Sequence, residues 1–202
     1  KRSQKAQQTR TRMLDAAREL FVQYGYGATT LQEIADRAGV AVQTIYFTFG
    51  NKRVLLKELA DVAIAGDNEP IATMDRRWFR DALAAETADD QLRRHVKGTR
   101  GILERLAPMI EMMRAATSAD PGIAEIWDEG TDPRFTVHQV AAKALVTKPG
   151  TRAGVTAAHA ADLLYSLLSP ELYLLLVRDR GWSPSRWERW TYDTLNTQLC
   201  AG

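Results

Sequence analysis

The chain has 202 residues, of which 45% are hydrophobic and 26% charged, with a formal net charge of +2 and a single cysteine. These values are ordinary for a globular protein with room for one small and one larger domain, and a lone Cys200 excludes an internal disulfide. The N-terminus lacks the apolar core of a signal peptide, and no apolar run of about 18 residues is recognisable, so we expect no membrane span.

Two helices are expected between residues 13 and 39. The first has apolar residues at helical spacing and ends at Gly25 and Gly27. Its apolar residues are Met13, Leu14, Ala17, Leu20, Phe21 and Tyr24. The second begins at Thr30 and Glu33, whose spacing is that of a capping box that satisfies free amides at a helix start. Gly39 then permits a sharp turn, because glycine accepts a positive φ at little cost.

A third, shorter helix follows this turn. Val40, Ile45 and Phe49 fall on a face that can anchor the helix to the core. Its start lacks a cap, because Ala41 has no side-chain acceptor for a free amide. The outer face carries small polar and aromatic residues, which are Gln43, Thr44, Tyr46 and Phe47. Such side chains suit a helix that lies in the major groove of DNA.

A connecting helix is expected over residues 51–65. Asn51 can cap it, and Lys52 lies in its first turn, where free amides and a lysine together suit a DNA phosphate. The short helices on either side of the turn form a helix-turn-helix over about residues 30–49. Double-stranded DNA is therefore the first partner to consider.

Charge along the chain favours the same partner. Residues 1–53 hold nine Lys/Arg and four Asp/Glu, a net charge of +5, whereas the remainder holds eighteen and twenty-one, a net charge of −3. The residues before the first helix form a basic lead, which is either a solvated, disordered tail or an arm that touches the DNA backbone or minor groove. The lead contains Lys1, Arg2, Lys5, Arg10 and Arg12.

This stretch resembles the TetR family of bacterial transcriptional regulators. The resemblance covers about residues 10–60, and elsewhere it depends on length and all-helical character. Ala41 departs from the pattern, because the family often has a capping Ser or Thr there. The matching segments are residues 16–21, Gly25 and Gly27, 29–35, 38–40, 44–46, Phe49, Asn51, Lys52, Leu55 and Leu56.

The resemblance implies an all-α fold with two domains. Residues 1–66 would form a DNA-binding domain of three helices with the connecting helix, and residues 67–202 an effector-binding and dimerisation domain. The family's function implies a cytoplasmic bacterial regulator, which we expect to be a homodimeric repressor on a near-palindromic operator. An unidentified, mostly apolar small molecule would release it.

Each DNA-facing residue has an expected role. Gln43 and Thr44 would approach base edges, and Gln43 can read adenine through two hydrogen bonds. Phe47 would contact a thymine methyl group or a sugar. Three further residues would hold phosphates and set the register, namely Tyr46, Thr30 and Lys52.

From about residue 70 the chain is expected to be almost entirely helical, without strands. Proline should kink the long helix at Pro108 and should start others after a capping serine. The expected helices cover about 78–85, 90–119, a segment after Pro121 that is interrupted near 130–133, and segments that open at 155–156, 169–170 and 183–184. The last helices contain many apolar residues, which indicates either a thick internal core or a helical dimer interface.

The body can also hold a ligand pocket, because methionines and polar-tipped aromatics suit a mostly apolar small-molecule site. The candidate residues are Met109, Met113, Arg114, Trp127, His138, Tyr165 and Tyr173. The alternative for each apolar or aromatic residue is ordinary core packing. For Arg114, which can pair with an anionic ligand, the alternative is a surface salt bridge.

The sequence gives little support for an enzymatic function. The histidines His95, His138 and His159 lack metal-ligand spacing, and Asp89-Asp90 is typical of a helix start. No Gly-rich phosphate loop, serine elbow or redox cysteine pair is recognisable, so we expect no catalytic residues, metal or cofactor. Two alternatives stay open: a helical small-molecule-binding protein or enzyme without DNA-dependent function, and a DNA-binding protein whose body only dimerises.

Overall fold

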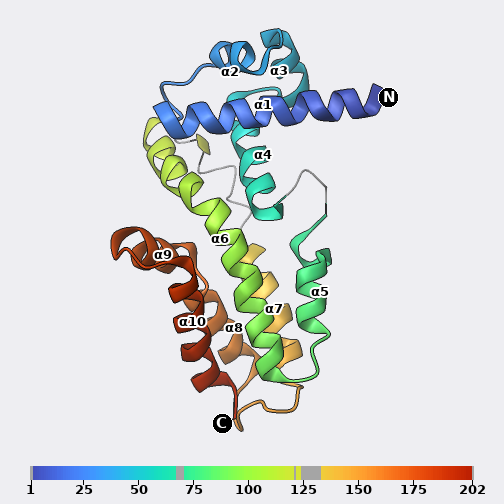
Figure 1. Ribbon diagram of the computed structural model, residues 1–202, viewed down its shortest axis with the longest axis vertical. Helices are drawn as coiled ribbons and strands as arrows, with labels where there is room; N and C mark the ends of the chain where they lie inside the picture. Colours follow the sequence, from blue (N-terminus) through green and yellow to red (C-terminus); the bar gives the residue numbers. More distant parts are fainter. Residues whose placement is uncertain (1, 67–70, 121, 124–132, 202) are drawn as a thin grey trace. The chain divides into compact units, whose positions relative to one another are not determined.

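The computed structural model describes residues 2–66, 71–120, 122–123 and 133–201, and every regular element within these ranges is helical (Figure 1). An isolated bridge between Thr151 and Cys200 is the β-type pairing found in these ranges. The all-α class that the sequence predicts is therefore confirmed.

The chain divides into two compact units. We call residues 1–68 and 108–129 the head unit, and residues 69–107 and 130–202 the body unit. The head unit contains α1 (Arg2–Tyr24), α2 (Leu31–Ala38), α3 (Val42–Phe49) and α4 (Lys52–Ala65). The body unit contains η1 (Thr73–Asp75), α5 (Arg77–Leu83), α7 (Pro133–Leu145), α8 (Ala157–Leu167), α9 (Pro170–Tyr173), the π-helical η3 (Leu174–Asp179) and α10 (Pro184–Leu199).

One long helix, α6 (Ala88–Ala119), contributes to both units. Pro108 lies inside α6, at the residue where the head unit's share begins. The expected long helix with an internal proline is therefore present. The last turns of α6 belong to the head unit, so the two compact units do not coincide with residues 1–66 and 67–202. The assignment of DNA binding to the first range and of effector binding and dimerisation to the second stays a prediction.

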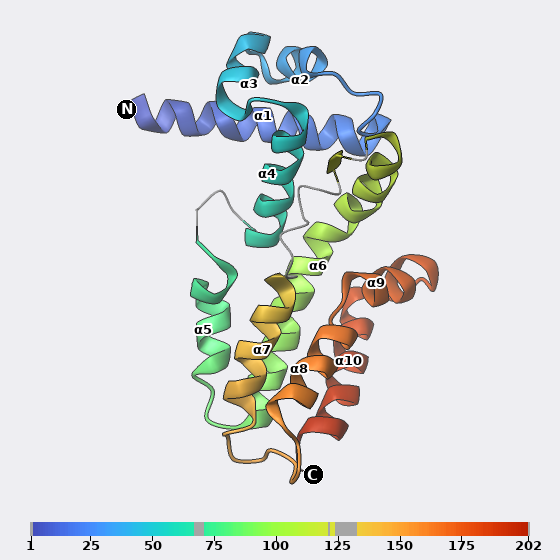
Figure 2. The same cartoon turned by 180° about the vertical axis from the view of Figure 1, so that it is seen from behind.

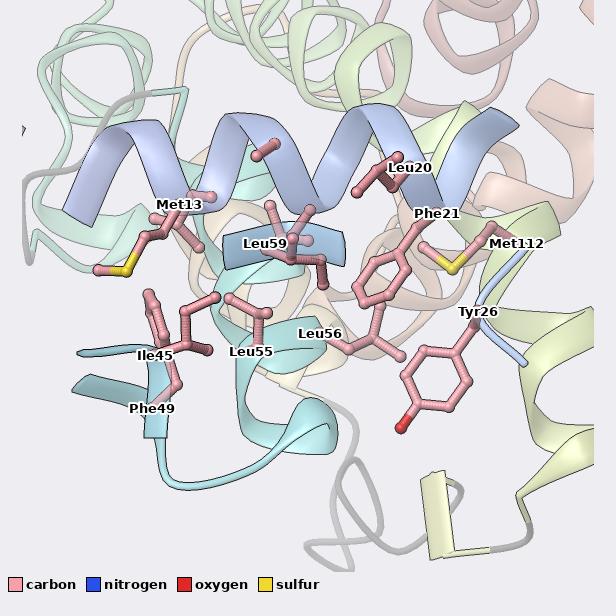
Figure 3. Close-up of a cluster of buried hydrophobic side chains, with 14 of the residues drawn as sticks. Met13, Leu20, Phe21, Tyr26, Ile45, Phe49, Leu55, Leu56, Leu59 and Met112 are labelled. Atoms are coloured by element: carbon pink, nitrogen blue, oxygen red, sulfur yellow. The ribbon is translucent and has the colours of Figure 1, made fainter. Parts of the chain in front are cut away.

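The head unit has its own hydrophobic core, which Figure 3 shows in close-up. Each of α1 to α4 buries one apolar stripe there, and the second part of α6 adds Met109 and Met112. The rings of Phe21 and Tyr26 are 5.3 Å apart between centroids. Tyr24, expected on the buried stripe of α1, is instead 57% exposed, because the helix ends there and the following loop inserts Tyr26 in its place.

The body unit is built around a second core. Its helices α7 and α8 pack on each other, and α8 also packs on α10 (Figure 2). The expected serine caps are confirmed, because Ser169 and Ser183 each accept a hydrogen bond from a backbone amide of the helix that follows. Thr156, where a helix was expected to begin, caps α8 in the same way. The helix expected after Pro121, which includes Trp127, lies outside the described residues.

The apolar residues of the last helices divide between the interior and the surface. Leu164, Leu168 and Trp187 are buried, whereas Leu175 is 50% exposed and Trp190 is 36% exposed. A thick internal core therefore accounts for a large share of them, and a smaller set is left at the surface.

The sequence predicts no membrane span, but the stretch Ala157–Asp179 is long and apolar enough to cross a membrane by length and composition. Its fold is that of a core segment, because a turn at Leu168 and the cap at Ser169 interrupt the helix. Several of its residues also pack into the body core, among them Ala160, Leu164 and Tyr173.

Candidate nucleic-acid interface

The helix α2 is fixed at both ends by contacts that the sequence predicts. The Thr30 hydroxyl accepts from the Glu33 amide at 3.2 Å, and the Glu33 carboxylate accepts from the Thr30 amide at 2.7 Å. The hydrogen bonds that the Thr30 amide and the Thr30 hydroxyl donate to the Glu33 carboxylate lower the pKa of Glu33. At the other end Gly39 has φ 65°, a left-handed conformation that closes the helix and turns the chain toward α3. The capping box and the glycine turn are confirmed.

The helix α3 separates its anchoring side chains from its outer ones. Ile45 is fully buried and Phe49 nearly so, whereas Tyr46 is 54% exposed and Phe47 is 94% exposed. Gln43 is also exposed, and Thr44 is half-buried. The amphipathic division predicted for this helix is therefore present. Tyr46 and Phe47 thus leave two neighbouring aromatic side chains exposed on the outer face of α3.

The start of α3 is uncapped, as its sequence predicts. Ala41 has the extended backbone of an N-cap residue, with φ −71° and ψ 144°, but it makes no side-chain hydrogen bond. The Thr44 amide donates to the Ala41 carbonyl at 2.9 Å, so the helix begins without help from a side chain. One or more amides at this end therefore point outward with no acceptor from a cap.

The first turn of α4 is organised by Asn51 and Lys52. Asn51 accepts from the Val54 amide at 2.9 Å, which confirms the predicted cap. The Lys52 ammonium turns inward, donates to the carbonyls of Tyr26 and Thr29 at 2.8 Å each, and lies 4.3 Å from the centroid of the Tyr26 ring. Partial burial lowers the pKa of Lys52. Lys52 therefore holds the loop between α1 and α2, a structural role that local sequence pattern did not indicate.

A long-range ion pair next to Lys52 was also missed. The Arg53 guanidinium donates to both carboxylate oxygens of Asp120, at 2.8 and 2.7 Å. Burial and the neighbouring Asp120 raise the pKa of Tyr26 to about 12. Arg53 and Asp120 lie 67 positions apart in the sequence, so no local sequence pattern could indicate this ion pair. They join the end of α6 to the first turn of α4 within the head unit.

The basic lead continues the first helix, because α1 is helical from Arg2. Lys5 and Arg12 are exposed. Arg10 is held instead, since it pairs with Glu58 and lies 5.3 Å above the Phe49 ring. Lys5 and Arg12 can therefore contact an anionic partner, whereas Arg10 packs against Phe49 of α3.

The candidate ligand residues fall in different places. Met109 is buried in the head core, and Met113 packs against that core. His138 and Tyr165 lie together in the body unit, with ring centroids 6.3 Å apart, whereas Tyr173 packs on Trp187. Trp127 and the side chain of Arg114 lie outside the described residues. The assignment of these residues to a pocket stays a prediction.

The structure brings together two histidines that the sequence spacing separates. Nε2 of His95, on α6, is 3.2 Å from Nδ1 of His138, on α7. Both side chains are buried, and burial lowers the pKa of His95 to about 3. The positions lie 43 residues apart, so a search for close metal-ligand spacing could not find them.

A helix-turn-helix whose second helix has an exposed aromatic and amide face is typical of DNA-binding domains. Residues 13–59 match the sequence model of the bacterial regulatory proteins of the tetR family. The HTH-type transcriptional regulator YvkB of Bacillus subtilis, itself uncharacterized, is 49% identical over 51 residues, which cover 25% of this chain and 27% of that protein. The chain matches about a quarter to a half of the length of its curated relatives.

Solved structures show the same fold over almost the whole chain. NalD, the secondary repressor of the MexAB-OprM multidrug efflux pump in Pseudomonas aeruginosa, superposes with a TM-score of 0.65 at 18% identity, over 98% of each chain. FadR from Bacillus subtilis in complex with stearoyl-CoA gives a TM-score of 0.65 at 18% identity, over 92% of this chain and 96% of that one. Residues 13–59 therefore match the tetR family of bacterial regulatory proteins, and the chain as a whole has the fold of these solved structures. The resemblance drawn from the sequence is confirmed.

Proposed function

We propose that this chain is a cytoplasmic bacterial transcriptional repressor, not an enzyme, that binds a near-palindromic operator as a homodimer and is released by a small molecule. The outer face of α3 is the observation that carries the proposal. It leaves Phe47 94% exposed while Ile45, two residues away, is fully buried. A rigidly anchored helix with an exposed apolar ring and a neighbouring amide suits insertion into the major groove.

Each DNA contact follows from side-chain chemistry. Gln43 would read adenine with its amide, Thr44 would approach a base edge, and Phe47 would contact a thymine methyl group or sugar. Tyr46 would bind a phosphate through its hydroxyl. Two of the three N–H donors of Lys52 already bind backbone carbonyls, so we propose at most one phosphate contact for this side chain.

Thr30 has a weaker claim to a phosphate than Tyr46. Its hydroxyl accepts from the Glu33 amide and donates to the Glu33 carboxylate at 2.8 Å. A phosphate would have to compete with that carboxylate, so we propose that Thr30 acts on DNA mainly by fixing the start of α2.

The surface of the last helices supports dimerisation. Trp182 and Trp190 meet edge to face with centroids 5.8 Å apart, and Arg186 lies 4.1 Å above the Trp182 ring. With the half-exposed Leu175, they give the body unit an aromatic and apolar surface that a second copy can cover. A two-fold dimer would place two heads on successive major grooves, which requires a near-palindromic site.

Release by a ligand requires a difference in affinity. A small molecule can shift the dimer away from its operator only if it binds the released state more tightly than the DNA-bound state. The buried His138 and the half-buried Tyr165 lie within the body unit, where we propose that this molecule binds. The FadR structure, which contains stearoyl-CoA, supports ligand binding by a protein of this fold.

The test is binding of the purified protein to fragments of its own genomic neighbourhood at several salt concentrations. We expect a sequence-selective complex with two chains per site, whose affinity falls steeply with salt. Gln43→Ala should weaken the specific complex by about 5- to 150-fold, corresponding to the roughly 1–3 kcal/mol of a bidentate base contact. Gln23→Ala, at an exposed position of α1 away from α3, is the matched control and should leave binding unchanged.

The outcomes separate the proposal from its alternatives. Weak binding that is equal on all sequences, including those from a genome-wide selection, would reject the regulator. Selective binding with no response to any of a broad set of small molecules would favour a regulator whose body only dimerises. Turnover or ligand binding indifferent to DNA would favour a carrier or enzyme.

A further inference from the structure

A row of polar side chains is buried inside the body unit. Gln91, His95 and Thr99 are spaced four residues apart on α6, and each is more than nine-tenths buried. Two of them contact α7: Gln91 Nε2 donates to the Ala141 carbonyl at 2.7 Å, and His95 Nε2 lies 3.2 Å from His138 Nδ1. Burying so many polar groups is costly unless each finds a hydrogen-bond partner.

Two buried atoms of this row have no such partner among the described residues. They are Gln91 Oε1 and His95 Nδ1. The bond from Nε2 to Ala141 fixes the orientation of the Gln91 amide, so its free oxygen can only accept. His95 Nδ1 accepts or donates according to which histidine holds the proton between them. When His138 holds that shared proton and donates it to His95 Nε2, His95 Nδ1 carries a proton of its own. A single hydroxyl group then matches the pair, because it accepts from His95 Nδ1 and donates to Gln91 Oε1.

The surroundings of His95 favour an uncharged ligand. The rings around it belong to Trp78, Phe79 and His138, at centroid distances of 6.1, 5.9 and 5.4 Å. Trp78 and Phe79 carry no charge, and burial keeps His95 itself neutral by lowering its pKa to about 3. A ligand ion placed against His95, Trp78 and Phe79 would lose its hydration without gaining a counter-charge from these three side chains.

Gly98 provides the space for a planar group beside His95. A Cβ on Gly98 would lie 2.0 Å from a carbon of the Trp78 six-membered ring, so the indole occupies a slot that only a glycine leaves open. Trp78 is half-buried and belongs to α5, a helix of seven residues. It is thus the member of the cluster with the shortest path to solvent, and its removal would open a slot one aromatic ring thick.

We propose that an uncharged aromatic molecule bearing a hydroxyl group displaces the Trp78 indole from Gly98 and hydrogen-bonds through that hydroxyl to His95 and Gln91. Its identification as the effector rests on the proposed function. The site itself rests on the buried polar row, the two unpartnered atoms and the slot at Gly98.

The test uses calorimetric titration of the full chain with three probes that share one ring system: 2-naphthol, 2-methoxynaphthalene and 2-naphthoate. We expect 2-naphthol to bind at least ten-fold more tightly than the ether, which cannot donate, and than the anion. His95→Phe should reduce the preference for 2-naphthol over the ether to less than three-fold. His159→Phe, which changes an exposed histidine of α8, is the matched control and should keep the preference.

Trp78→Ala gives an effect of opposite sign. Because it removes the ring that must leave, it should tighten both neutral probes several-fold while the preference for the hydroxyl persists. A cavity created only by the substitution would instead bind the ether and 2-naphthol equally. If His95→Phe does not fold, the imidazole nitrogen shifts of His95 in the wild-type chain should change with 2-naphthol and not with the ether.

Three results would overturn the site: no saturable binding of 2-naphthol to the wild-type chain, equal affinity for the three probes, or an unchanged preference in folded His95→Phe. Operator binding is measured separately on the unliganded protein. Selective 2-naphthol binding without DNA release would leave the site standing and remove its role as effector site, whereas absent operator binding would reject the regulator alone.

Discussion

The head unit and the body unit use polar side chains in opposite ways. In the head, α3 exposes Gln43 and Tyr46, and the capping contacts join residues three positions apart. In the body, Gln91 and His95 are buried and reach partners 50 and 43 positions away. A surface that meets an external partner can be built from local pattern, whereas an internal polar site needs the tertiary fold to bring its members together.

The largest expected effect separates anchoring from recognition within α3. Ile45→Ala should reduce the free energy of unfolding by about 2–5 kcal/mol, because it removes a fully buried side chain from the head core. Phe47→Ala, two residues away at a 94% exposed position, should change that free energy by less than about 0.5 kcal/mol and yet weaken operator binding. Urea denaturation and DNA titration of both variants measure the two effects. Equal stability losses would contradict the assignment of faces.

The second effect concerns acid and the body unit. Since the folded pKa of His95 is about 3 against an ordinary 6.5, the unfolded chain takes up a proton below pH 6.5 that the folded chain does not. The free energy of unfolding should therefore fall as the pH drops from about 6.5 toward about 3, at up to about 1.4 kcal/mol per pH unit. Urea denaturation between pH 7 and pH 5 checks this slope.

The acid effect is checked by comparing how the free energy of unfolding depends on pH in two histidine variants. His95→Phe should flatten the slope over that pH interval whatever its stability at pH 7, while His159→Phe should retain the wild-type slope. An identical slope in wild type and His95→Phe would show that other groups cause the acid sensitivity.

Sequence reasoning succeeded where the physical cause is local. The capping box at Thr30, the caps at Asn51 and Ser183, and the missing cap at Ala41 each depend on residues within one helical turn. The apolar stripe of α1 was predicted except at Tyr24, where the helix ends and the period no longer applies. The turn chemistry and the spacing of α3 were enough to indicate a groove-reading head.

It failed where the cause is a contact across the chain. Nothing near Lys52 indicates that its ammonium binds the carbonyls of Tyr26 and Thr29, and nothing near Arg53 indicates Asp120. The contact between His95 and His138 was not predicted for the same reason, since each histidine alone is typical of an ordinary helix.

The third effect tests that missed role of Lys52. Lys52→Met keeps much of the aliphatic stem but removes the donor to two carbonyls, so the free energy of unfolding should fall by about 1–3 kcal/mol. Lys57→Met, at a half-buried position farther along α4, is the comparison. Thermal unfolding followed by circular dichroism measures both. If Lys52→Met weakens DNA binding without loss of stability, the lysine acts on phosphate more than on the loop.

The smallest effect is a gain in stability, and it concerns the uncapped start of α3. Ala41 already has the extended backbone of an N-cap residue, so Ala41→Ser should add a hydrogen bond to a free amide of α3 without strain. We expect the free energy of unfolding to rise by about 0.5–1 kcal/mol. Thr30→Ala provides the opposite change at α2, with an expected loss of similar size because the capping box there is complete. If Ala41→Ser leaves stability unchanged but weakens the operator complex, the uncapped amides of α3 are themselves DNA contacts, since a serine hydroxyl would then compete with a phosphate for them.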